Sequence, residues 1–265
     1  MRVVKSQLTY CLDLLTVLAG QAQGVRLTDL ASGLHAPKSS TQRLLEHLAA
    51  QGWAEQDENT GRYRLTARLA VLGQRYLQSA GIADAAQSLL DRLARETGEL
   101  ARLTTVDGRR LVWIGSAQGA TPGLRYEPSM GEPIVSFATA NGKAWLATLP
   151  EEEALAIALS DGLRKTARGK QLGPNAMRST SALATDLQTV RRRGYALSEE
   201  EAEAGVAAIA VTIIDPATKA ALGTTSVAGP RVRMTPSRYE TIARLLRSTA
   251  DEMALAWPSA RHSNN

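Results

Sequence analysis

Cysteine is almost absent from this chain of 265 residues, which contains only Cys11. A single cysteine cannot form an internal disulfide, so a reducing cytosol is the expected location. Aromatic residues make up only 4% of the sequence, with one phenylalanine, so alanine and leucine must supply most of the packing. No apolar run reaches the roughly 20 residues of a membrane-spanning helix, and we therefore expect no membrane partner.

The residues that build catalytic and metal sites are also scarce. The chain has three histidines: His35, His47 and His262. None has metal-ligand spacing to another histidine or to the cysteine. The Gly142-Lys143 pair is not a phosphate loop, because Phe137 stands where the first glycine should be and Ala144 follows the lysine. We therefore predict no catalytic residue, no metal and no cofactor.

The length and charge of the chain fit two domains, one of which binds nucleic acid. A chain of 265 residues is long for one domain, and its 44% hydrophobic content can form an ordinary core. The net charge is only +5, and the positive surplus in the first 80 residues is modest. This balance suits a protein that places a few cations precisely, and does not suit a nonspecific polycation.

Residues 27–66 carry the pattern around which the chain is organised. Two short helices are predicted by apolar residues at i, i+3, i+4 and i+7: Leu27, Leu30, Ala31 and Leu34, then Leu44, Leu45, Leu48 and Ala49. Pro37 marks the turn between them and suits the first turn of the second helix. Residues 53–66 alternate around the turn residues 59–61, which indicates a hairpin. Together these features predict a winged helix-turn-helix.

The second of these helices begins with small, polar and cationic side chains that face outward: Lys38, Ser39, Ser40, Thr41 and Arg43. Such side chains reach base edges and phosphates in a major groove of double-stranded DNA. Arg62, just past the hairpin tip, is expected to reach an adjacent phosphate or the minor groove. Two short helices alone would fit an enzyme core equally well, but the polar cluster and the hairpin favour DNA binding.

Amphipathic helices flank this region. Residues 6–21 predict a helix whose apolar face, with Leu8, Leu12 and Leu18, should pack under the helix-turn-helix. Residues 67–81 predict a linker helix with a stripe that includes Leu72 and Tyr76. The stripe can pack on its own domain or on a second subunit. We favour a homodimer, because two half-sites multiply affinity and specificity, and leave a dimer of dimers open.

The remainder of the chain predicts an α+β domain over residues 82–257, followed by a disordered tail at 258–265. A helix at 82–97 precedes two short β-branched runs joined by the turn Asp107-Gly108, which is a hairpin signal. Residues 205–215 are a nearly continuous apolar strand with an antiparallel partner at 222–228. Helices are also predicted at 139–149, 150–160, 179–193 and 235–256. The domains are thus 1–66, the linker 67–81, and 82–257.

The chain resembles the IclR-type bacterial transcriptional regulators, in which the recognition helix opens with proline, a polar or basic residue, serine, threonine and then arginine. Those positions here are Pro37, Lys38, Ser39, Ser40 and Arg43. Where the family usually has glycine in the turn, this chain has His35, which can adopt a positive φ at some cost. The spacing of residues 194–215, and the segment 125–149 with Gly-Lys-Ala, resemble the family's effector domain, so the likeness covers nearly the whole chain.

This resemblance implies a C-terminal domain of GAF-like fold that binds a small metabolite, often a carboxylate. Carried over by position, its pocket includes Tyr126, Ile134, Ala140, Asn141, Ser198, Ala208, Ser226 and Ala228. Arg125 and Met130 lie with Tyr126 in a Gly/Pro-rich loop, 119–133, which is the expected moving part. Chemistry makes Asn141 plausible, since we expect it to precede a helix whose free N–H groups attract anions. For each pocket residue a purely structural role, such as capping a helix, is the alternative.

The small residues at 198 and 208 distinguish this chain from glyoxylate- or pyruvate-type members of the family. Smaller, less charged walls would suit a different and bulkier ligand. The chain as a whole is predicted to be a homodimeric, cytoplasmic transcription factor that binds a DNA operator and senses a small organic acid. The alternatives are a small-molecule enzyme with an accessory helix-turn-helix domain and an architectural DNA-binding protein without a ligand.

Overall fold

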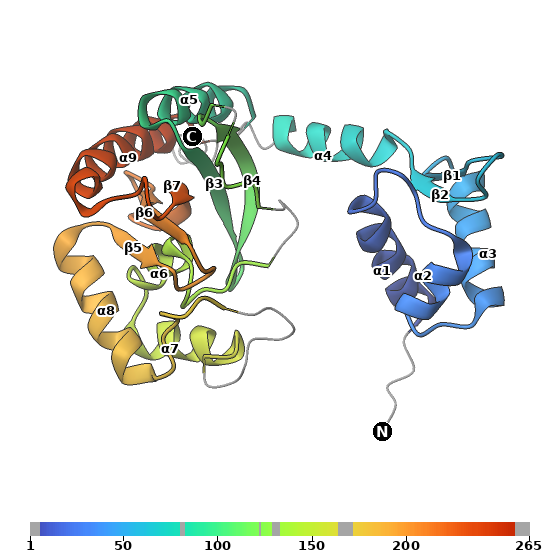
Figure 1. The fold of residues 1–265 in the computed structure, drawn as a ribbon, viewed down its shortest axis with the longest axis horizontal. Coiled ribbons are helices and arrows are strands. Elements are labelled where there is room, and N and C mark those ends of the chain that lie inside the picture. The colour runs from blue at the N-terminus through green and yellow to red at the C-terminus, as the bar shows by residue number, and fades with distance from the viewer. Residues whose placement is uncertain (1–5, 80–82, 122, 129–132, 164–171, 258–265) are drawn as a thin grey trace. The chain divides into compact units, whose positions relative to one another are not determined.

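The computed structural model describes residues 6–79, 83–121, 123–128, 133–163 and 172–257. The chain divides into two compact units, residues 1–79 (unit 1) and residues 80–265 (unit 2) (Figure 1). Residues 68–79 of the predicted linker helix are grouped with unit 1. The predicted tail, 258–265, lies outside the described residues. The finer domain boundaries at 66 and 81 stay predictions.

Unit 1 contains a three-helix core with a short hairpin, as the sequence predicts, followed by a further helix, α4. The elements are α1 (Gln7–Ala19), α2 (Leu27–Gly33), α3 (Lys38–Ala50), β1 (Ala54–Gln56), β2 (Tyr63–Leu65) and α4 (Arg68–Ser79). Ser6 caps α1 by accepting a hydrogen bond from the N–H of Thr9. The core consists of buried apolar residues from α1, α2, α3 and β2: Leu14, Leu18, Leu30, Leu45 and Tyr63. The helix-turn-helix therefore rests on α1.

The predicted packing face of α1 is partly wrong. Leu18 is buried as expected, but Leu8 and Leu12 are 70% and 55% exposed, and Leu14 fills the core position instead. The physical reason is that α1 carries leucines around more than one side. Periodicity then cannot tell which side faces the core. The outcome leaves apolar side chains of α1 at the surface of unit 1.

Unit 2 is built on one antiparallel sheet with the strand order β4-β3-β7-β6-β5. Its strands are β3 (Leu100–Asp107), β4 (Arg110–Gln118), β5 (Ala196–Glu199), β6 (Val206–Ile214) and β7 (Ala221–Pro230). The hairpin predicted at Asp107-Gly108 joins β3 and β4, and Gly108 has the positive φ of 60° that such a turn requires. The sequence did not predict the short strand β5.

Helices cover both faces of this sheet. The helices are α5 (Ala83–Thr97), α6 (Ala140–Leu146), α7 (Glu151–Ser160), α8 (Thr180–Arg193) and α9 (Pro236–Ala256). One large core joins α5 and α9 to one face, whereas α6, α7 and α8 lie on the other (Figure 1). Because successive residues of a strand point to opposite faces, β6 sends Ile209 and Val211 toward α9 and sends Ala208 and Ala210 toward α6. The α+β fold class is confirmed.

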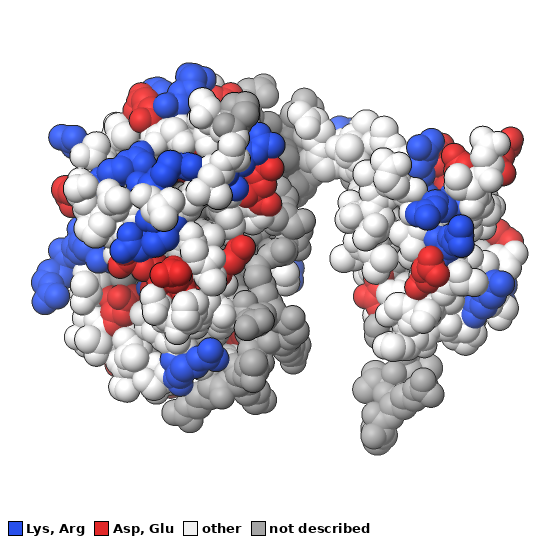
Figure 2. Space-filling model, in the orientation of Figure 1, with Lys and Arg blue, Asp and Glu red and all other residues white. Residues whose placement is uncertain are grey.

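The surface carries charges of both signs in each unit. Lys and Arg are interspersed with Asp and Glu over the visible face of both units (Figure 2). This mixture agrees with the modest net charge of +5. In the described ranges, no helix is both long and apolar enough to cross a membrane.

Candidate nucleic-acid interface and ligand cavity

The turn between α2 and α3 sets the direction of α3. His35 has φ of 51°, in the left-handed region, and its N–H donates to the carbonyl of Ser32 at 3.0 Å. The expectation that this position takes a positive φ is therefore confirmed. Pro37 precedes the first helical residue, and is not itself in the first turn. Its carbonyl accepts a hydrogen bond from the N–H of Thr41 at 3.0 Å.

Four of the five predicted residues at the start of α3 are exposed: Lys38, Ser39, Ser40 and Arg43. Thr41 is the exception and requires a correction, because only 1% of it is exposed. Its hydroxyl donates to the carbonyl of Pro37 at 3.1 Å, and it shares the buried face of α3 with Leu45 and Leu48. A residue in this position supports the helix and cannot reach a base.

Three further exposed polar residues on α3 were not predicted from the sequence: Gln42, Glu46 and His47. Gln42 donates through Nε2 to Oε1 of Glu46 at 2.9 Å, so the orientation of its amide is held by its neighbour one turn on. Helical spacing from Arg43 and Ser39 could have found these residues. The exposed polar face of α3 therefore extends beyond its first turns, as far as His47.

The hairpin turn is fixed by Asp57. Its Oδ1 accepts hydrogen bonds from the N–H and the hydroxyl of Thr60, both at 2.8 Å. The pKa of the Asp57 carboxyl is lowered, chiefly because the backbone N–H of Thr60 donates to its charged form. Arg62, predicted to reach DNA, is partly buried, and its Nη1 donates to the carbonyl of Gly24 at 3.0 Å. Arg64 pairs with Glu55 at 2.7 Å.

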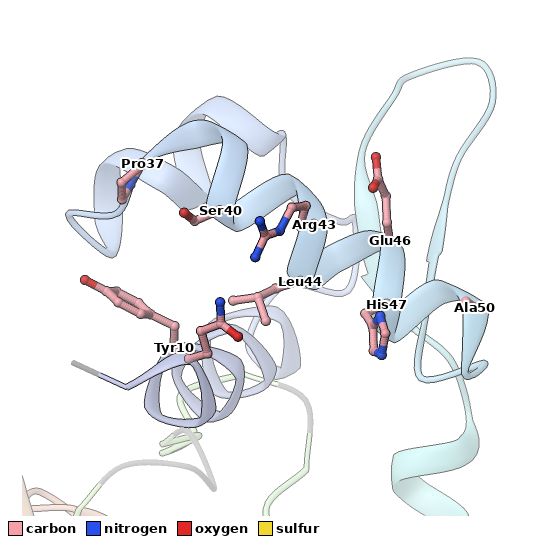
Figure 3. Close-up of a pocket in the computed structure, with 9 residues that line it drawn as sticks. Tyr10, Pro37, Ser40, Arg43, Leu44, Glu46, His47 and Ala50 are labelled. Carbon is pink, nitrogen blue, oxygen red and sulfur yellow. The ribbon is translucent and has the colours of Figure 1, made fainter. Parts of the chain in front are cut away.

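A groove of about 720 Å³ runs between α1 and α3. In Figure 3, Tyr10 stands on α1 opposite α3, and the Arg43 side chain extends into the space between the helices. Glu46 points away from that space toward the hairpin side. Arg43 therefore lies where it can contact a nucleic-acid backbone that approaches α3 from the side of α1.

A second cavity, of about 50 Å³, lies in unit 2 on the face of the sheet that α6 covers. Seven of the ten predicted effector positions line it: Tyr126, Ala140, Asn141, Ser198, Ala208, Ser226 and Ala228. These residues come from β5, β6, β7, α6 and the loop after β4. The sheet register brings Ser198 opposite Ala208, and Ala208 opposite Ala228, on one face. One cavity therefore unites positions more than 100 residues apart.

Six further residues line the same cavity and were not predicted: Arg102, Trp113, Thr139, Ala202, Glu203 and Val206. The guanidinium carbon of Arg102 lies 3.4 Å from the centroid of the Trp113 ring, a cation–π stack. Arg102 is buried and pairs across the sheet with Ser226. The lining therefore includes a buried cation and the carboxylate of Glu203 in addition to the small residues at 198 and 208.

Hydrogen bonds organise the polar side of the cavity. Ser198 donates through Oγ to the carbonyl of Ala138 at 2.8 Å, and Asn141 donates through Nδ2 to Oγ1 of Thr224 at 2.9 Å. Asn141 lies within the first turn of α6 and does not precede it, which corrects the sequence-based expectation. The capping residue is Thr139, whose Oγ1 accepts from the N–H of Gly142 at 3.1 Å.

Among the described residues, two predicted effector residues do not line the cavity. Arg125 forms an ion pair with Glu127 at 3.0 Å. Ile134 packs instead against the apolar cluster under α7 and α8. Met130 lies outside the described residues.

A buried ion cluster connects α6 to the segment that carries Ala202 and Glu203. Lys143 of α6 pairs with Glu201 and, at 3.1 Å, with Asp186 of α8. The pKa of Glu201 is raised because burial disfavours its charged form, and Lys143 acts in the opposite direction. The cluster therefore links α6 to residues 201–203, which supply two walls of the cavity.

In the described ranges, no group of three or more His, Cys, Asp or Glu residues is placed to hold a metal ion. The donors of the cavity are instead hydroxyls, an amide and a guanidinium, which bind organic groups through hydrogen bonds.

Comparison with known proteins covers both units. The family model described as bacterial transcriptional regulator IclR C-terminal matches residues 74–255, and the model described as IclR helix-turn-helix domain matches residues 11–58. The transcriptional regulator XynR of Escherichia coli is 33% identical over 202 residues, which cover 76% of this chain and 77% of XynR.

Two other similar proteins extend this result. The transcriptional regulator BhcR of Paracoccus denitrificans is 32% identical over 243 residues, which cover 92% of this chain and 84% of BhcR. The crystal structure of an IclR transcriptional regulator from Alicyclobacillus acidocaldarius matches with a TM-score of 0.80 at 23% identity, over 94% of this chain and 98% of that one. The latter likeness supports the fold alone.

Proposed function

We propose a function for this chain from the premise that it belongs to the IclR family of bacterial transcriptional regulators. The chain is a DNA-binding regulator whose C-terminal half is an effector-binding domain. Its relatives are regulators, so the alternative of an enzyme with an accessory helix-turn-helix domain is set aside.

Unit 1 binds its operator by inserting α3 into the major groove. Lys38 and Arg43 supply the cations, and Ser39 and Ser40 supply hydroxyls for base edges or phosphates. All four are exposed on α3, which supports this assignment. Arg62 contacts an adjacent phosphate only after it leaves the carbonyl of Gly24, so its share of the affinity is smaller.

Unit 2 binds a small organic acid in the cavity beside α6. The single observation that carries this proposal is that seven residues chosen by sequence position line one cavity. Its alanines contribute apolar walls, and Ser198, Ser226 and Asn141 contribute polar groups. Small-molecule sites typically combine such walls with a few convergent polar groups.

A homodimer forms through the apolar surface of unit 1. Exposed apolar residues lie on α4 and α1: Val71, Leu72 and Tyr76, with Leu8 and Leu12. Exposed apolar patches of this kind mark interaction sites in soluble proteins. A second copy of the chain fits this surface, because a two-fold dimer presents two helix-turn-helix units to the two half-sites of an operator.

Effector binding changes which dimer arrangement is favoured. A ligand shifts such an equilibrium only if it binds the two arrangements with different affinities. The loop after β4 is the candidate element, because Tyr126 lines the cavity and its carbonyl accepts from Nε2 of Gln118 at 3.0 Å. Arg233 also donates to the carbonyl of Leu124 in this loop.

The test is a thermal-shift screen of the full-length chain against aliphatic and aromatic carboxylates. A ligand that binds only the folded protein at 100 times its Kd stabilises it by about 2.7 kcal/mol, which raises the unfolding temperature by several degrees. The same compound must change the affinity of the chain for a duplex that the chain has selected from a random library. Silence across the panel from a folded chain refutes the organic-acid assignment and leaves DNA binding untouched.

A further inference from the structure

The strand β5 covers only part of the edge of β6. It pairs with residues 207–210, whereas β6 also includes residues 211–214. If the pairing continued, Gly194 would lie opposite Thr212. The N–H of Gly194 instead donates to the carbonyl of Val190 at 2.8 Å, and its φ of 80° ends α8. Among the described residues, no strand lies on the outer side of 211–214.

The backbone of this uncovered stretch has hydrogen-bonding groups directed outward. On the β5 side of β6, the carbonyl of Val206 accepts from the N–H of Glu200 at 2.8 Å. Backbone groups along a strand point alternately to its two neighbours, so Thr212 and Ile214 direct theirs to the same side as Val206. Both residues therefore present an N–H and a carbonyl to the open edge. Such an edge can pair with a further strand.

A groove of about 310 Å³ follows this edge, and we call it the edge groove. Its walls include Ala144 of α6 and Val190 of α8 on one face of the sheet, and Ala250 of α9 on the other. The described residues that line it all differ from those that line the ligand cavity. Helices on both faces leave space for one extended chain segment. The β6 strand of a second copy carries its own helices on both faces and does not fit between them.

Cations outnumber carboxylates around the edge groove. Arg191 and Arg247 line it, against Asp251. Arg191 is anchored by hydrogen bonds to two backbone carbonyls at the end of α6, and Arg247 pairs with the exposed Glu240. Arg192, which is exposed in the last turn of α8, adds a further positive charge. The electrostatic complement of this surface is therefore an acidic segment.

We propose that the edge groove binds an acidic, extended segment of a partner protein, which joins the sheet as a strand beside β6 and in line with β5. The segment runs antiparallel to β6, as β5 does. The hydroxyl of Thr212 donates to the carbonyl of Ala144 at 2.8 Å, so this side chain points toward α6. Cross-strand neighbours share a face, so the partner residue opposite Thr212 also points toward α6, where small walls accept an apolar side chain. The next partner residue points toward α9, where Arg247 favours a carboxylate.

The experiment is a fluorescence-anisotropy titration of the full-length chain with labelled pentapeptides. In one, glutamate alternates with valine (EVEVE), and in the other lysine replaces glutamate (KVKVK). Two further EVEVE peptides carry N-methyl groups on the amides of either the valines or the glutamates. In the proposed pairing the valine amides face β6 and the glutamate amides face away from it.

Two variants of the chain test the groove itself. Thr148→Trp fills it from an exposed lining position, and Gln188→Trp, an exposed position of α8 outside the lining, is the matched control. Arg247→Glu reverses one charge of the lining. Its control is Arg110→Glu, because Arg110 is exposed and lies on β4, where it pairs with Asp107.

Wild-type protein is expected to bind EVEVE and not KVKVK. Methylation of the valine amides should abolish binding, whereas methylation of the glutamate amides should preserve it. Arg247→Glu should weaken binding by about tenfold or more, because it places like charges together. Thr148→Trp should abolish binding, and both controls should leave it unchanged. If Thr148→Trp does not fold, the methylated peptides and Arg247→Glu still decide the proposal.

Three results overturn the inference: no saturable binding of EVEVE to wild type, equal binding of EVEVE and KVKVK, or equal effects of the two methylations. Competition by N-acetylglutamate amide as strong as by EVEVE would assign the groove to a small molecule instead. If EVEVE does not bind, weaker self-association of Thr148→Trp would identify a second copy as the occupant. Faster hydrogen exchange of the C-terminal peptide in that variant would identify a segment of this chain. Each of these outcomes leaves the proposed function untouched, because the edge groove and the ligand cavity have different linings.

Discussion

Lys143 donates to both carboxylate oxygens of Glu201, at 2.6 and 2.9 Å, although Lys143 is fully buried. The bond joins α6, which supplies Asn141 to the ligand cavity, to the segment that supplies Ala202 and Glu203. A buried ion pair is costly to form in water-free surroundings, but it is much more costly to break. The pair therefore holds two walls of the cavity in one arrangement.

Lys143→Met should destabilise the chain by about 3–5 kcal/mol, because it leaves the charge of Glu201 buried without its partner. Lys143→Met combined with Glu201→Gln should recover part of this loss. Urea unfolding followed by tryptophan fluorescence measures both, since Trp145 lies in α6. A double variant less stable than Lys143→Met would contradict the ion-pair argument.

The Lys143→Met variant should also acquire a pH dependence. Burial raises the pKa of Glu201 above its ordinary value of 4.5, and the lysine that lowers it is gone. A carboxyl whose folded pKa is raised contributes stability below its unfolded pKa, and this contribution is lost as pH rises through the folded pKa. The stability difference between variant and wild type should therefore be larger at pH 8 than at pH 5.

Arg43 and Thr41 should behave differently in DNA binding, although the sequence groups them together. Arg43→Ala should weaken operator binding by about 1–3 kcal/mol, whereas Arg192→Ala, an exposed change on α8, should not. Thr41→Val removes a buried hydrogen bond, which should lower stability by about 0.5–1.5 kcal/mol without weakening binding by the folded fraction. Gel-shift titrations at constant salt measure these affinities, and equal losses for Arg43→Ala and Arg192→Ala would refute the assignment.

Gly142 should not tolerate a side chain. A Cβ at this position would lie 2.3 Å from the carbonyl oxygen of Ser136, and backbone cannot move aside cheaply. Gly142→Ala should therefore cost at least 1–3 kcal/mol, about the usual range for overpacking. Gly73→Ala is the matched control, because nothing lies within 4 Å of its Cβ, and alanine favours the helix α4. Thermal unfolding should give a lower unfolding temperature for Gly142→Ala than for Gly73→Ala. A Gly142→Ala protein as stable as wild type would show that the backbone near Ser136 can shift to accept the side chain.

Leu72 should contribute to self-association. Leu72→Glu places a charge in the exposed apolar surface of α4 and should weaken the dimer. Val232→Glu is the control, because it changes an apolar residue of unit 2 that is even more exposed, at 75% against 49% for Leu72. Sedimentation equilibrium across a range of concentrations compares the two variants. Equal dissociation constants for both would exclude this surface as the dimer contact.

The sequence predicted best those features that depend on local spacing or on a family position. The helix-turn-helix, the hairpin turns and seven cavity residues are of this kind. Thr41 could also have been placed, because Thr41, Leu45 and Leu48 share a helical face. Thr41 was predicted to contact DNA because its side chain is polar, although its helical spacing places it with the core leucines.

Features that depend on pairing between distant strands could not be predicted. Arg102 reaches the cavity only because β3 pairs with β7 in a register that sets it opposite Ser226. Trp113 follows from the pairing of β4 with β3, which contains a register shift at Leu103. A shift of one residue would reverse which side chains face α6. The side of α1 that faces the core is a similar choice between two apolar faces, made by tertiary packing.

His35 provides the most local prediction. Its φ of 51° is costly for a residue with a Cβ, by about 1–2 kcal/mol in a left-handed conformation, and glycine avoids this cost. Glycine also loses more conformational entropy on folding, which offsets about 0.4–1 kcal/mol. His35→Gly should therefore be more stable than His35→Ala by up to about 1 kcal/mol. Amide hydrogen exchange of peptides from residues 27–50 isolates this effect from unit 2, since it reports the local opening of α2 and α3. Slower exchange in His35→Ala than in His35→Gly would mean that the side chain, and not the backbone conformation, decides the stability of the turn.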